Sequence, residues 1–71
     1  MGFAQVERLL IRLLVRSGME EDEMLATVLC LESMEAKIQM IKWIASKKNP
    51  TSQEILHHLI EMIRAAKGEQ K

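Results

Sequence analysis

The chain has few of the residues that build strands, cross-links or tight turns. Its 71 residues include one cysteine, one proline, three glycines, one tryptophan, one phenylalanine and no tyrosine. A single cysteine excludes an internal disulfide, and the lack of alternating β-branched or aromatic runs argues against strands. A chain of this length holds one domain with one small core. The composition therefore predicts a single all-α domain over residues 1–71.

Long apolar runs and a net charge are also missing. No segment approaches the roughly 18 apolar residues of a membrane-spanning helix, and arginines interrupt the first apolar stretch, which argues against a secretory signal. Basic and acidic residues both number 10, so the formal net charge is zero, whereas nucleic-acid binders usually carry a basic excess. The lone thiol suits a reducing compartment, so we expect a cytoplasmic protein. The charge balance and the short apolar runs favour neither a nucleic acid nor a membrane as its partner.

Four segments show helical periodicity, and their expected ranges are about 3–16, 20–31, 34–47 and 52–66, with a frayed tail at 68–71. Ser33 fits an N-cap, yet the second and third segments could also form one kinked helix. Asn49-Pro50 and the capping-box pattern from Thr51 to Glu54 separate the third segment from the fourth. The predicted fold is a compact bundle of three to four short helices that dimerisation completes.

Charges along the chain are sorted into blocks. Three arginines and one glutamate give residues 1–18 a charge of +2, and six acidic residues give residues 19–35 a charge of −6. Four lysines and no acidic residue give residues 36–48 a charge of +4. Alternating blocks suit helices that pack against one another, within a chain or across a dimer, better than they suit a polyanionic partner.

Three of the four expected helices are apolar over too wide an arc for one small core. At about 100° per residue, the first helix is apolar over roughly 240° and leaves a thin stripe for Arg8, Arg12 and Arg16, whereas one core needs little more than 100°. The second is apolar nearly all round from Met24 to Leu31, and the third over roughly 220°. Surplus apolar surface predicts association, most commonly as a two-fold homodimer.

The candidate interface comprises apolar residues of the first and third helices. These residues are Leu10, Ile11, Leu14, Val15, Met40, Trp43 and Ile44. Trp43 lies at the rim of its helix's apolar arc, where it fits equally an interface anchor or a half-buried lid on the core.

No residue pattern predicts catalysis, a cofactor or a metal. The neighbouring side chains of His57 and His58 point about 100° apart and cannot share an ion, so we expect helix-surface pairs with Glu61 and Glu54. Cys30 lies within the apolar second helix, which predicts a small buried hydrophobe. The chain shows neither a glycine-rich phosphate loop nor a nucleophile–histidine arrangement.

The expected function is that of a small non-catalytic helical interaction or regulatory module, acting as a homodimer or docking on a partner protein. One alternative is a DNA-binding regulator, because the last two helices resemble a helix-turn-helix in outline, although Glu54 and Glu61 would repel phosphate. A second alternative is a membrane-surface binder whose first helix turns its arginines towards lipid head groups.

Overall fold

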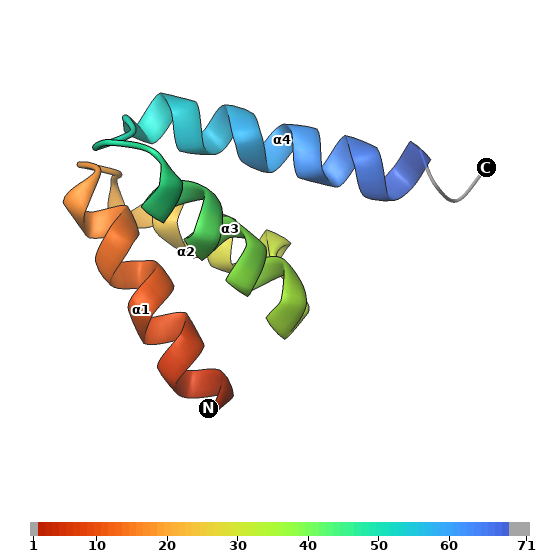
Figure 1. Ribbon diagram of the computed structural model, residues 1–71, viewed down its shortest axis with the longest axis horizontal. Coiled ribbons are helices and arrows are strands. Elements are labelled where there is room, and N and C mark those ends of the chain that lie inside the picture. Colours follow the sequence, from red (N-terminus) through yellow and green to blue (C-terminus); the bar gives the residue numbers. More distant parts are fainter. Residues whose placement is uncertain (1, 69–71) are drawn as a thin grey trace.

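The computed structural model of the protein describes residues 2–68, which form four helices joined by short loops (Figure 1). The helices are α1 (Phe3–Arg16), α2 (Glu21–Cys30), α3 (Met34–Ser46) and α4 (Ser52–Gly68). The predicted all-α class is confirmed, since no strand occurs within residues 2–68. Gly68 is the last residue of α4, and residues 69–71 of the expected frayed tail lie outside the described residues.

Two short connections separate the first three helices. After α1, Gly18 adopts a positive φ of 85°, which is accessible to glycine without strain. Between α2 and α3, the Ser33 hydroxyl accepts a hydrogen bond from the backbone N–H of Ala36 at 3.0 Å. This N-cap starts α3 as a helix of its own, so α2 and α3 are two helices rather than one kinked helix.

The turn before α4 uses the predicted proline and capping box. Asn49 has a φ of 50°, a left-handed conformation that asparagine tolerates, and Pro50 is buried. The Thr51 hydroxyl accepts from the Glu54 N–H at 3.2 Å, while the Glu54 carboxylate accepts from the Thr51 N–H at 3.0 Å. The Glu54 carboxylate also accepts from the Thr51 hydroxyl at 3.2 Å, and the two hydrogen bonds that it accepts lower the pKa of Glu54. The capping bonds satisfy backbone N–H groups at the helix start.

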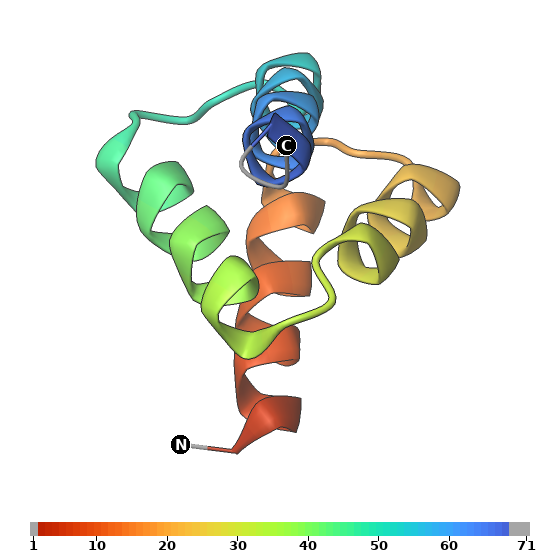
Figure 2. The same ribbon diagram turned by 90° about the vertical axis from the view of Figure 1, so that its right-hand side faces the viewer.

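The helices surround a core to which α2 contributes little. Figure 2 shows α2 and α3 on opposite sides of α1, with α4 lying across the end of this group. The clustered buried apolar residues are Leu10, Leu14, Met19, Leu31, Met40, Ile44, Ile55 and Leu59. Met19 and Leu31 belong to the connections on either side of α2, and Thr27 is the buried residue within that helix. Most apolar side chains of α2 therefore lie outside the core.

The capping box predicts a specific loss of stability. Thr51→Ala removes the hydroxyl acceptor at the start of α4, so the free energy of unfolding should fall by about 1 kcal/mol in chemical denaturation. Thr51→Ser keeps a hydroxyl at the same position and should retain most of that stability. Equal midpoints for the alanine and wild-type chains would show that the cap contributes nothing.

Candidate interaction surface

Exposed and half-buried apolar side chains lie on the neighbouring flanks of α1 and α2, and we name this surface the α1–α2 face. It consists of Ile11, Val15, Met24, Leu25, Val28 and Leu29. The exposed fractions are 75% for Leu29, 57% for both Leu25 and Val15, and 40% for Ile11. Ile11 of α1 lines one shallow hollow together with Met24, Leu25 and Val28 of α2, and the acidic side chain of Glu21 lines the same hollow. Val15 follows Ile11 by four residues and Leu29 follows Leu25 by four, so each extends the surface along its helix.

Helix geometry explains why these side chains are not in the core. In α1, the core stripe runs through Val6, Leu10 and Leu14, which are at most 1% exposed. Ile11 is turned about 100° from Leu10, so it lies on the flank of that stripe. In α2, Leu25 precedes buried Thr27 by two positions and Leu29 follows it by two. Both therefore point to roughly the opposite side of the helix from Thr27.

Opposite charges border the two sides of the α1–α2 face. On α1, Arg8 and Arg12 are exposed and precede Ile11 and Val15 by three residues each, which places them beside the apolar side chains. On α2, Glu21 and Asp22 are exposed and precede Leu25 by four and three residues. Within residues 2–68, none of these four charged side chains forms an ion pair.

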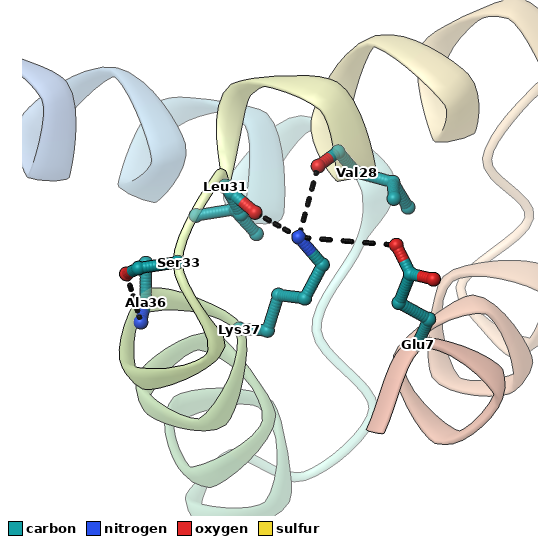
Figure 3. Close-up of polar contacts among 6 residues, drawn as sticks. All are labelled: Glu7, Val28, Leu31, Ser33, Ala36 and Lys37. Atoms are coloured by element: carbon teal, nitrogen blue, oxygen red, sulfur yellow. Dashed lines mark hydrogen bonds and ion pairs between the residues drawn. The ribbon is translucent and has the colours of Figure 1, made fainter. Parts of the chain in front are cut away.

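A buried lysine sets the position of α2 relative to α1 and α3 (Figure 3). Lys37 of α3 is only 2% exposed. Its Nζ donates to the backbone carbonyl oxygens of Leu31 and Val28, the latter at 3.4 Å. The same atom lies 3.9 Å from Glu7 Oε2 on α1, so one ammonium group contacts three elements.

The lysine occupies a site that favours a cation. The last carbonyl groups of a helix lack partners within it, and this end of the helix carries partial negative charge. Lys37 supplies both a donor and a positive charge there, while Glu7 adds a carboxylate from α1. The C-terminal end of α2 is thus held by a charged group in addition to the apolar contacts of Val28 and Leu31 with the core, and its outer side chains remain exposed.

The sequence interpretation missed this cluster, although a signal was present. Glu7 is the only charge inside the apolar arc of the first helix. Lys37 precedes Met40 by three residues and Ile44 by seven, so it shares their buried stripe. A single charge in an apolar arc can have several explanations. Opposite charges in the apolar arcs of two helices, Glu7 and Lys37, indicate a buried ion pair more specifically.

The structure distributes the seven predicted interface residues over three environments. Four of them, Leu10, Leu14, Met40 and Ile44, are at most 5% exposed and belong to the core of a single chain. Ile11 and Val15 lie on the α1–α2 face, and Trp43 is half-buried elsewhere. A wide apolar arc does not reveal which part of it faces the core, and the four core residues are therefore not accessible to a partner of the folded chain.

Cys30 departs from the sequence expectation. The apolar segment predicts a small buried hydrophobe, which is wrong, because the Cys30 side chain is exposed at the end of α2. The reason is again the orientation of α2, because Thr27 and Leu31 take the core positions in this part of the chain.

Trp43 contacts α4 within the chain. Its ring stacks on that of His58, with centroids 4.2 Å apart and planes 7° from parallel, and Lys47 Nζ lies 5.5 Å from the Trp43 ring centroid. Partial burial lowers the pKa of His58; Lys47 lowers it further and Glu61 opposes the shift. Of the two predicted histidine pairs, His57 contacts Glu61 at 3.7 Å. The Glu54 carboxylate instead accepts hydrogen bonds from Thr51.

In residues 2–68, no group of three histidine, cysteine or acidic residues is arranged to hold a metal ion. None of the four described helices has the length and apolar character needed to span a bilayer. Comparisons with protein families, with curated proteins and with solved structures found no match to this chain.

The Lys37 cluster predicts a large effect from one substitution. Lys37→Met keeps most of the apolar stem but removes the donor to the Leu31 and Val28 carbonyl groups, so the free energy of unfolding should fall by about 1–3 kcal/mol. Lys42→Met, at an exposed position of the same helix, is the matched control and should change it by less than about 0.5 kcal/mol. Similar losses in both variants, measured by urea denaturation, would contradict the assigned role.

The lowered pKa of His58 predicts a pH-dependent stability. The folded chain binds a proton at His58 less readily than the unfolded chain does. The contribution of neutral His58 to the free energy of unfolding is therefore complete above the ordinary histidine pKa of about 6.5. It should be lost progressively as the pH falls below that value towards the lowered pKa. His58→Gln should reduce the dependence of the free energy of unfolding on pH, measured between about pH 8 and pH 5. An unchanged slope would place its origin in other groups.

Proposed function

We propose that this protein is a small non-catalytic interaction or regulatory module that works by association through the α1–α2 face, as a homodimer or on a partner protein. The observation that carries the proposal is the hollow that Ile11 of α1 shares with Leu25 of α2, with exposed Val15 and Leu29 one helical turn further along each helix. Single exposed apolar residues are common on soluble proteins, whereas contiguous apolar patches mark interaction sites.

The distribution of exposed apolar residues supports a localised surface. Leu29 and Leu25 belong to the most exposed large hydrophobic residues in the described chain, and both lie on this face. Ile60 is 48% exposed but lies on a different helix, α4. We propose a cytoplasmic location for the module, in keeping with a single cysteine that is exposed and has no disulfide partner in the chain.

A substitution on the face tests whether it mediates association. Leu29→Glu places a charge where the side chain is already 75% exposed, so it should leave the fold intact while removing binding. Wild-type chain at about 100 µM should either self-associate in light scattering or bind a hydrophobic fluorescent probe, and Leu29→Glu should reduce whichever signal is present. Ile60→Glu on α4 is the control and should preserve it.

A second pair of variants lies on one helix and is matched in exposure. Ile11 and Leu9 are 40% and 41% exposed, but a separation of two residues turns them about 200° apart, so only Ile11 lies on the face. Ile11→Glu should reduce association and Leu9→Glu should not, with circular dichroism showing equal helix content. A monomer that binds no probe would remove the basis of the proposed function.

A further inference from the structure

We infer that the occupant of the α1–α2 face is a second copy of this chain, related by a two-fold axis that sets α1 of each copy against α2 of the other. The inference rests on the proposed function, because it names the partner for that same surface. It is carried by the charges that border the apolar residues.

The two borders of the face are complementary to each other. Arg8 and Arg12 lie on the α1 side, and Glu21 and Asp22 lie on the α2 side, all exposed and without an ion pair among residues 2–68. When a two-fold axis exchanges α1 and α2 across the contact, the arginines of each copy meet the carboxylates of the other. The complementary contact then forms twice, as an isologous interface requires.

The same charges oppose the other two-fold arrangement. If α1 faced α1, Arg8 and Arg12 would meet the same arginines of the second copy, and the acidic residues of α2 would likewise meet each other. Like charges placed opposite one another across an interface are unfavourable and exclude a pairing. The charge pattern therefore selects the arrangement of α1 on α2.

The chain as a whole does not resist pairing with itself. Its formal net charge is zero, so two copies approach without the long-range repulsion that keeps strongly charged proteins apart. In the contact, Leu25 and Leu29 of one copy would meet Ile11 and Val15 of the other. Burial of these side chains supplies the affinity, and the charged borders supply the orientation.

Charge exchange tests this arrangement directly. One variant carries Arg8→Glu and Arg12→Glu, and the other carries Glu21→Arg and Asp22→Arg. Each alone should weaken self-association about tenfold or more in sedimentation equilibrium at low salt, because both copies of the contact become repulsive. An equimolar mixture should form a heterodimer with a Kd close to that of the wild type, since every border then faces the opposite charge.

Controls separate this effect from altered folding or total charge. Arg64→Glu with Lys67→Glu, on exposed positions of α4, lowers the net charge by the same amount as Arg8→Glu with Arg12→Glu and should leave self-association unchanged. Circular dichroism should show wild-type helix content in every variant. Leu29→Glu, which adds a charge within the contact on each of the two symmetry-related copies, should weaken self-association by about a hundredfold.

The possible results distinguish this inference from the proposed function. A wild-type monomer whose probe binding is lost in Leu29→Glu would overturn the second copy as occupant and leave the face available to another partner. A dimer that is insensitive to Leu29→Glu and to both charge variants would overturn the face itself. Weakened variants that fail to associate when mixed would overturn the arrangement of α1 on α2.

Discussion

The relative placement of α1, α2 and α3 depends on one buried ammonium group. Lys37 projects from α3, binds the last carbonyl groups of α2 and faces the Glu7 carboxylate of α1. A buried lysine is costly unless partners satisfy its charge and its donors, and here a helix terminus and a carboxylate provide them. Because these partners come from separate segments, the cluster also specifies which segments meet.

This polar attachment explains the most unusual feature of the surface. A helix that packs through a broad apolar stripe hides that stripe, whereas α2 fully buries Thr27 alone and packs only Met24 and Val28 partly against the core. Leu25 and Leu29 are left pointing outwards beside the exposed flank of α1. The α1–α2 face is thus a consequence of how α2 is held, and the proposed association supplies the apolar neighbour that the core does not.

Local signals predicted the helices well, because each signal acts over a few residues. Thr51 and Glu54 form their capping box, and Ser33 caps α3. The predicted starts and ends differ from the observed ones by at most two residues. The candidate surface was predicted less well, since Leu10, Leu14, Met40 and Ile44 proved to be core residues. An apolar arc of roughly 240° is compatible with several orientations of the helix, and periodicity does not choose between them.

The sequence by itself determined the helical class, the break between α3 and α4 and the presence of more apolar surface than one small bundle covers. These properties follow from residue type and spacing, which act within one helix or one turn. Only the tertiary structure decided which side of each helix faces inwards, that Lys37 is buried and that Cys30 is exposed. Those outcomes depend on contacts between residues far apart in the chain, such as Glu7 with Lys37, and no local pattern specifies where such residues meet.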